Sequence, residues 1–207
     1  MPITSSPIAT SRLKRVILAP LTGPVLLALA VSLLLALAMS TTTAKANGAP
    51  ATSTTSSMAD PGFTRIQARH SAMCLDVRAA SPSPGAPLLQ WHCGETANQQ
   101  FSSAAGGGAF NLAPGAAPTS IWVRHSAQVL DNGSSFARSS QIQQWPFHGG
   151  TQQQWVFLPA GDNWFLIHNK HSGQCLDIKD GSRRTGARAN QFPCHGNANQ
   201  QFRFLDQ

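Results

Sequence analysis

The sequence predicts an all-β domain made of three copies of one repeat. Three segments align as His-Ser-x-x-x-Leu-Asp, at residues 70–76, 125–131 and 171–177. An isoleucine stands ten residues before each Asp, and an aromatic residue stands 14 or 15 residues after it. Short apolar runs lie between clusters of Gly, Ser, Asn and Asp, without sustained helical periodicity, which indicates strands of about four to six residues joined by turns.

Each copy runs in the same order from its isoleucine to a closing Gln-x-aromatic triplet. The isoleucines are Ile66, Ile121 and Ile167, the motif leucines are Leu75, Leu130 and Leu176, and the triplets are 99–101, 153–155 and 200–202. Four strands per copy give about twelve strands, and closing them on themselves would hide the sheet edges. We therefore expect a β-trefoil with pseudo-threefold symmetry, with these residues and the closing Phe101, Trp155 and Phe202 in its core.

The first copy is longer than the second. Successive motif Asp residues are 55 and then 46 residues apart, and the Gly-, Ala- and Pro-rich stretch 104–118 accounts for the difference. We interpret this stretch as a surface loop insertion, which a fold tolerates at little entropic cost. The repeats then cover about 63–118, 119–160 and 161–207, and together they form one domain over 63–207.

The first 46 residues are predicted to be a signal peptide. A basic stretch ends at Arg15, an apolar run covers 25–39, and the small-residue triplet 44–46 follows. As a helix the apolar run would span about 22 Å, short of the roughly 30 Å of a bilayer core. A retained membrane anchor is the alternative, and both interpretations predict export. Residues 47–62 lack large apolar side chains and are expected to form a flexible linker.

The charge of the chain does not favour a nucleic-acid partner. Only 11% of the 207 residues are charged, with 15 Lys and Arg against 8 Asp and Glu. Four basic residues and no acidic ones precede position 47, which leaves an excess of three positive charges in the remainder. This excess forms no basic stripe, so we expect no nucleic-acid partner and, after cleavage of the signal peptide, no membrane association. The oligomeric state is left open.

The four cysteines are predicted to form two disulfide bonds within copies. Export favours disulfides over free thiols, and Cys74 and Cys93 are separated by 19 residues, as are Cys175 and Cys194. The equal spacing selects these two bonds from three possible pairings. No Cys-x-x-Cys or closely paired His accompanies them, so we expect no metal and no cofactor. The middle copy has Val129 and Phe147 at the cysteine positions, which indicates an apolar contact in place of a bond.

These motifs resemble the ricin B-type lectins, whose threefold repeat carries a Cys-Leu-Asp strand, an aromatic-x-Cys strand and a closing Gln-x-Trp. The resemblance covers residues 63–207, and with the export segment the chain is similar to secreted bacterial-type members. It implies a β-trefoil that binds sugars in shallow pockets, up to one on each repeat. Members commonly bind galactose-type sugars, and bacterial ones also bind xylan or arabinose-rich polysaccharides. The expected partner is therefore a carbohydrate.

The resemblance implies one set of binding residues in the first copy and one in the third. These are Asp76, Trp91, Asn98 and Gln99, and then Asp177, Asn190, Phe192, Asn199 and Gln200. The residue types suit a sugar, because a carboxylate accepts hydrogen bonds from neighbouring hydroxyls and an aromatic ring stacks on the apolar face. Leu89 stands where the third copy has Asn190, so the first set lacks one polar contact.

The middle copy departs further from the family pattern. Its candidate residues are Asp131, Gln143, Trp145, Gln152 and Gln153. Gln152 replaces the asparagine of the other copies, so a longer amide must fit where a shorter one belongs. We expect this copy to bind sugar more weakly than the others.

Several other interpretations compete with sugar binding. The motif Asp residues could cap turns, and the glutamines of the closing triplets could bond to backbone. A Ser-His-Asp triad is disfavoured because the motif occurs in every copy, and Glu95 is the only Glu available for a glycosidase pair. We therefore expect no enzyme activity. A trefoil that has lost its pockets and binds protein, for instance as an inhibitor, is the alternative function.

Overall fold

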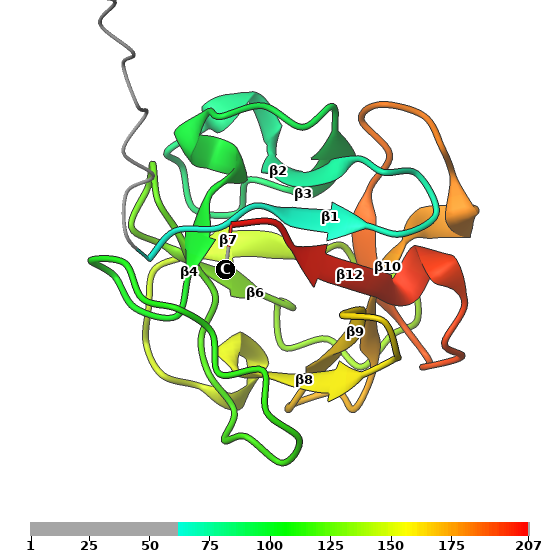
Figure 1. Ribbon diagram of the computed structural model, residues 1–207. Coiled ribbons are helices and arrows are strands. Elements are labelled where there is room, and N and C mark those ends of the chain that lie inside the picture. Colours follow the sequence, from blue (N-terminus) through cyan, green and yellow to red (C-terminus); the bar gives the residue numbers. More distant parts are fainter. Residues whose placement is uncertain (1–61, 207) are drawn as a thin grey trace, which may run out of the picture. The chain divides into compact units, whose positions relative to one another are not determined.

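The computed structural model describes residues 62–206, so the predicted signal peptide and nearly all of the predicted linker lie outside the described residues. The described part forms twelve short strands and five short 3-10 helices, shown in Figure 1. None of these helices is long and apolar enough to cross a membrane. The strands fall into three groups of four, one group for each predicted copy.

The elements have the following bounds. The first copy contains β1 (Ile66–Ala68), β2 (Cys74–Val77), η1 (Arg78–Ala80), β3 (Leu88–Trp91), η2 (Ala97–Gln99) and β4 (Phe101–Ser102). The second contains β5 (Trp122–Val123), β6 (Val129–Asp131), β7 (Gln143–Trp145), η3 (Thr151–Gln153) and β8 (Trp155–Pro159). The third contains β9 (Phe165–Asn169), β10 (Cys175–Ile178), η4 (Lys179–Gly181), β11 (Ala189–Phe192), η5 (Ala198–Gln200) and β12 (Gln201–Phe204).

Six strands close into a ring, because the last strand of each copy pairs with the first strand of the next. The pairs are β4 with β5, β8 with β9, and β12 with β1, all antiparallel. Figure 1 shows β1 and β12, from opposite ends of the domain, lying side by side. Within copies, β9 pairs with β12, and the bridges Thr64 to Phe101 and Thr119 to Trp155 complete the ring. The predicted β-trefoil is confirmed.

The other six strands form three hairpins that meet on the threefold axis. They are β2 with β3, β6 with β7, and β10 with β11. The side chain of Gln141 joins them, since its Nε2 lies 2.7 Å from the carbonyl oxygen of Leu88, 2.8 Å from that of Ile142 and 2.7 Å from that of Ala189. Each of these three residues stands three positions before the aromatic that ends its hairpin, so one amide links equivalent points of all three copies.

The core contains the residues that the repeat predicts. Ile66, Ile121, Ile167, Leu75, Leu130, Leu176, Phe101, Trp155 and Phe202 are all fully buried. Trp155 also satisfies its indole N–H, which donates to the Leu130 carbonyl at 3.1 Å. The prediction that the closing aromatics are core residues rather than ligand contacts is therefore confirmed.

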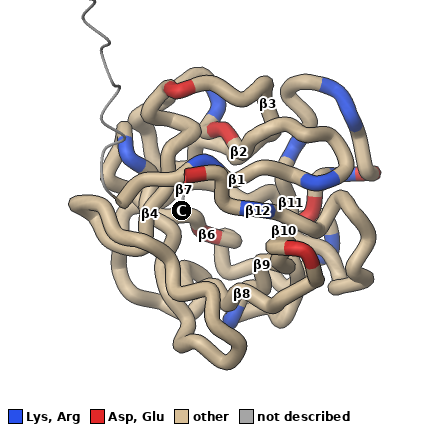
Figure 2. The backbone as a smooth tube through the Cα atoms, in the orientation of Figure 1, with Lys and Arg blue, Asp and Glu red and all other residues tan. Residues whose placement is uncertain are grey.

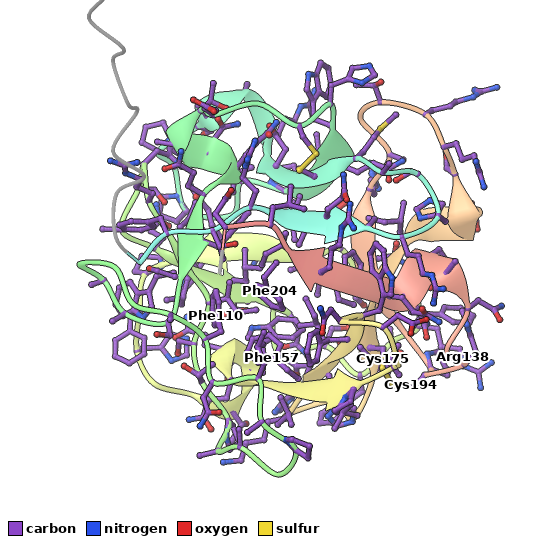
Figure 3. All side chains as sticks on the ribbon, viewed as in Figure 1. Phe110, Arg138, Phe157, Cys175, Cys194 and Phe204 are labelled. Atoms are coloured by element: carbon purple, nitrogen blue, oxygen red, sulfur yellow. A yellow bond between two sulfur atoms is a disulfide. The ribbon has the colours of Figure 1, made fainter. Side chains whose placement is uncertain are left out.

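The insertion at 104–118 is more than the surface loop that its composition suggests. It carries Phe110, which is buried and packs its ring against Phe157 and Phe204 at centroid distances of 5.2 and 5.1 Å (Figure 3). A single large apolar side chain among small residues anchors the loop to the barrel strands β8 and β12. The stretch therefore extends the core.

A repeated Ser–Gln pair explains the serine of the His-Ser motif. Ser71, Ser126 and Ser172 donate to the fully buried Gln90, Gln144 and Gln191 at 2.8, 2.9 and 2.8 Å. Each glutamine then donates to two carbonyls in the loop of another copy: Ser182 and Arg184, Ser81 and Ser83, or Ser135 and Ala137. The motif therefore belongs to a turn that ties each copy to a neighbour.

An ion pair fastens the beginning of the domain to its end. Arg65 donates from Nε to Oδ2 of Asp206 at 3.1 Å and from Nη2 to Oδ1 at 3.0 Å. The guanidinium holds the pKa of the Asp206 carboxyl below its ordinary value. This bidentate salt bridge reinforces the pairing of β1 with β12.

The two disulfides join the predicted cysteines, Cys74 with Cys93 and Cys175 with Cys194, the second labelled in Figure 3. In the middle copy Val129 is buried, but the Phe147 ring is 52% exposed and lies 5.0 Å from the ring of Trp122 on β5. The bond is therefore replaced by an aromatic pair at the surface, formed with Trp122.

Removing one disulfide is expected to weaken the domain without unfolding it. Each bond closes a loop of about 20 residues, which corresponds to roughly 3 kcal/mol in the loop-entropy description. The double variant Cys175→Ala and Cys194→Ala should lose about that much free energy of unfolding in guanidinium titrations, with an unchanged circular dichroism spectrum. The matched variant at Cys74 and Cys93 should behave alike, because the middle copy folds without a bond. A peptide map showing a bond between copies would contradict the pairing.

Candidate functional site

Two buried carboxylates lie at equivalent places in the first and third copies. Asp76 on β2 is 6% exposed, and its Oδ2 accepts hydrogen bonds from Asn98 Nδ2 at 2.9 Å and from Gln99 Nε2 at 2.8 Å. Both amides come from η2, which ends two residues before the closing aromatic on β4. The structure therefore brings together three of the four residues predicted in this copy around one oxygen atom.

The third copy repeats this geometry. Asp177 on β10 is 4% exposed, and its Oδ2 accepts from Asn199 Nδ2 at 2.8 Å and from Gln200 Nε2 at 3.0 Å. Within residues 62–206, Oδ1 of Asp76 and Oδ1 of Asp177 accept no hydrogen bond. Each carboxylate thus has one oxygen held by the protein and one available to a ligand.

The glutamines of the two sets hold the carboxylate and the adjacent loop in place through their hydrogen bonds. Gln99 Oε1 accepts from the Gly94 N–H at 2.8 Å, and its Nε2 also donates to the His92 carbonyl at 3.0 Å. Gln200 accepts from two backbone N–H groups and donates to the Pro193 carbonyl in the same way. Since both side chains are buried and their polar atoms are engaged, they position the carboxylate and the loop beside it.

Burial affects the protonation of both carboxylates. Loss of water raises the pKa of Asp76 and that of Asp177, while the hydrogen bonds from the neighbouring amides partly offset this effect. Both groups therefore bind a proton at a higher pH than an exposed aspartate does.

An aromatic ring stands beside each carboxylate. Asp76 pairs in register with Leu89, and Trp91 lies two residues further along β3, so its side chain is on the same face. Trp91 is 46% exposed, which leaves much of its ring open to a ligand. In the third copy Asp177 pairs with Asn190, and Phe192 takes the place of the tryptophan.

Both sets line hollows in the surface. The first hollow has a volume of about 990 Å³, and its lining residues include Asp76, Leu89, Trp91, Asn98 and Gln99. The second has a volume of about 330 Å³, and its lining residues include Asp177, Asn190, Phe192 and Asn199. Asn190 is buried to 2% exposure, and its Oδ1 has no hydrogen-bond partner in the described part of the chain, so it leaves an acceptor beside this hollow.

The middle copy does not assemble the same set. Oδ1 of Asp131 accepts from the Gly133 N–H, which makes this residue a turn cap. Gln153 bonds to the backbone of Pro146 and His148, and the Gln152 side chain lies 3.4 Å from the His148 ring. Neither amide reaches the carboxylate. Gln143 pairs in register with Asp131, and Trp145 is 41% exposed.

A histidine beside two of the carboxylates was missed in the sequence. His195 Nε2 lies 3.4 Å from Asp177 Oδ2, and His148 Nε2 lies 3.7 Å from Asp131 Oδ2. Each follows directly after the position of the second cysteine, where the first copy has Gly94. Their recurrence at one repeat position was the signal available in the sequence.

Residues from a second copy also line the hollows. Gln141 of the second copy and Gly186 and Arg188 of the third line the hollow of the first, and Ser139 of the second copy lines the hollow of the third. The alignment of single repeats carries no signal for these neighbours, because closure of the ring alone brings them there.

Comparison with known proteins identifies the family. Residues 62–202 match the profile of the Ricin-type beta-trefoil lectin domain. A search of curated proteins finds no match. Among solved structures, the designed threefold-symmetric protein ThreeFoil is 33% identical with a TM-score of 0.64, and the match covers 70% of this chain and 99% of that one.

Two natural structures share the fold at lower identity. The exo-beta-1,3-galactanase 1,3Gal43A from Clostridium thermocellum is 24% identical with a TM-score of 0.63, and the match covers 71% of this chain and 30% of the enzyme. The C-half of the earthworm R-type lectin, solved in complex with GalNAc, is 20% identical with a TM-score of 0.54, covering 71% and 100%. With the profile match over most of the chain, the protein belongs to the ricin-type β-trefoil lectin domain family.

Proposed function

We propose that the protein is a secreted carbohydrate-binding module with one sugar site at Asp76 and a second at Asp177. The observation that carries this proposal is the carboxylate with one oxygen held by two amides and the other free, next to an aromatic ring. Neighbouring sugar hydroxyls donate to such a carboxylate in charge-assisted hydrogen bonds, while the apolar face of the sugar stacks on Trp91 or Phe192.

The sugar class that we propose is galactose-type, or the xylan and arabinose-rich chains of plant polysaccharides. The GalNAc complex of the earthworm lectin supports a galactose-type ligand for this fold. The two disulfides support secretion, because such bonds persist in oxidising compartments.

Binding without catalysis agrees best with the geometry. A hydrolytic triad needs a serine that hydrogen-bonds to its histidine, but Ser71, Ser126 and Ser172 donate to buried glutamines. A glycosidase uses a pair of carboxylates, but the lining of the first hollow includes only Asp76. The hollow of the third copy includes Asp177 and Asp180, and Oδ2 of Asp177 is held by Asn199 and Gln200. We therefore propose a site that holds its ligand unchanged.

A protein-binding module is the alternative, and the middle copy favours it. In that copy Gln152 and Gln153 do not bond to the Asp131 carboxylate, and Trp145 and Phe147 are 41% and 52% exposed. Exposed aromatic side chains are common in protein interfaces.

Replacing the two carboxylates is expected to abolish sugar binding while the domain stays folded. Asp76→Asn and Asp177→Asn keep the side-chain shape and remove a charge whose burial is costly, so the thermal midpoint should stay the same or rise. Each single variant should weaken retention on a multivalent polysaccharide by about two orders of magnitude, because one site alone binds at about millimolar strength. The double variant should show no retention in affinity electrophoresis.

Asp131→Asn is the matched control for this experiment, because it changes the equivalent carboxylate of the copy that lacks the amide pair. It should change retention least. Full retention of the double variant would refute the sugar sites and favour the protein-binding alternative. A glycan array probed with the parent and the double variant would identify the sugar.

Sugar binding is expected to fail on acidification before the fold does. A protonated carboxyl loses the charge that strengthens its hydrogen bonds, and burial raises the pKa of Asp76 and Asp177 above the ordinary value of about 3.9. Retention should thus fall at a pH above about 4. A pKa raised by folding means that protonation of these groups favours the folded state, so they do not drive acid unfolding. Circular dichroism at each pH checks this, and retention that persists well below the ordinary pKa would contradict the assignment.

A further inference from the structure

The two hollows differ at one threefold-related position. On the first copy Asp76 pairs in register with Leu89, and Leu89 forms a bridge with Arg188 of the third copy. The corresponding row of the third copy runs from Asp177 through Asn190 to Gln141. The equivalent row of the middle copy ends at Pro87. Of these three sets of residues paired across neighbouring strands, only the set that begins at Asp76 ends in a positively charged residue, Arg188.

The register places Arg188 across the first hollow from Asp76. Residues paired across strands have side chains on the same face, and neighbouring strands lie about 4.8 Å apart, so the two backbones are separated by about 10 Å. Leu89 lies between them, and all three residues line the hollow. This spacing accommodates a sugar unit with one end at the carboxylate and the other at the guanidinium.

A second arginine reaches the same hollow. Arg78 on η1 lines it, and the backbone N–H of Arg78 donates to the Pro87 carbonyl at 3.1 Å, which fixes η1 beside the threefold axis. Arg78 and Arg188 are exposed, and neither forms a salt bridge or a side-chain hydrogen bond within residues 62–206. Figure 2 shows the basic residues of the loop that leads to β11 in blue. Both guanidinium groups are free to bind an anion.

The hollow of the third copy has the opposite charge. Its lining contains Asp177, Asp180 and no Lys or Arg, and its one other titratable group, His195, lies 3.4 Å from Asp177 Oδ2. Its volume is about 330 Å³, against about 990 Å³ for the first. An anionic group placed there would share the hollow with two carboxylates. An anionic group in the first hollow meets two guanidinium groups, whose planar donors match carboxylate or sulfate oxygens.

We propose that the first site takes an anionic saccharide, with ring hydroxyls on Asp76 and a carboxylate or sulfate group on Arg188 and Arg78, whereas the third site takes a neutral sugar. This rests on the proposed function and deepens it, because it assigns a different sugar class to each of the two sites. The anionic group lies at the end of the hollow away from Asp76, where it avoids the negative charge of that residue.

Titration calorimetry in the Asp177→Asn background isolates the first site. The probes are a galacturonic acid trimer, a sulfated galactose trimer and a neutral galactose trimer, so the two charged arms distinguish a uronate from a sulfate ligand. At least one charged trimer should bind about tenfold more tightly than the neutral one. Raising the ionic strength should remove that advantage.

Arg188→Gln and Arg78→Gln should each weaken binding of the charged trimer by about tenfold and weaken binding of the neutral trimer by clearly less. Arg183→Gln is the matched control, since Arg183 lies in the same loop but does not line the hollow, and it should have no effect. Equal affinity for charged and neutral trimers, or no effect of Arg188→Gln, would overturn the inference and leave the sugar site intact.

A failure of the proposed function looks different. In that case none of the three trimers would bind, or charged trimers would bind equally well after Asp76→Asn, which would show an anion site without sugar recognition. The complementary background, Asp76→Asn, should bind the neutral trimer and reject both charged ones. Binding of a charged trimer through the third site would also overturn the inference.

Discussion

Closure of the ring between copies is the constraint on which the rest of the structure depends. A copy of four short strands has an unpaired edge on either side, and only the strands of its neighbours can cover both edges. The pairing of β12 with β1, reinforced by Arg65 and Asp206, is therefore as necessary as any contact within a copy. The copies are also joined by side chains. The buried glutamines Gln90, Gln144 and Gln191 each donate to carbonyl groups in the loop of another copy.

The candidate sites follow from this arrangement. The closing triplet of a copy places an aromatic side chain in the core and, two residues earlier, a glutamine under the carboxylate. Packing of Phe101 or Phe202 in the barrel thus sets the position of Gln99 or Gln200, which lies only two residues earlier and donates to the carboxylate. The carboxylates lie deeper than the shallow pockets of the family imply, and burial raises their pKa.

The sequence predicts the features that recur in every copy and misses those that depend on a neighbour. The strands, the core isoleucines and aromatics, and both disulfides follow from one alignment of the repeats. The amide pairs around Asp76 and Asp177 agree with the residue sets that the family resemblance implies. The alignment of the repeats does not predict Arg188 as a site residue, because it belongs to the third copy and lines the hollow of the first. Phe110 escapes notice because one aromatic in a Gly- and Ala-rich stretch gives no periodic signal. Asp131 keeps the motif but caps a turn, because its carboxylate accepts from the Gly133 N–H.

Perfect threefold repetition would be incompatible with the way in which this axis is filled. The positions held by Pro87, Gln141 and Arg188 are equivalent, and they converge where a single amide binds three carbonyl groups. Three glutamines would compete for a space that admits one, and the two excluded side chains would have to turn outward. The second copy supplies the side chain that fills the axis, and Pro87 and Arg188 make no such contact. In this protein the three equivalent positions at the axis therefore carry different side chains, and the arginine that lines the hollow of Asp76 occupies one of them.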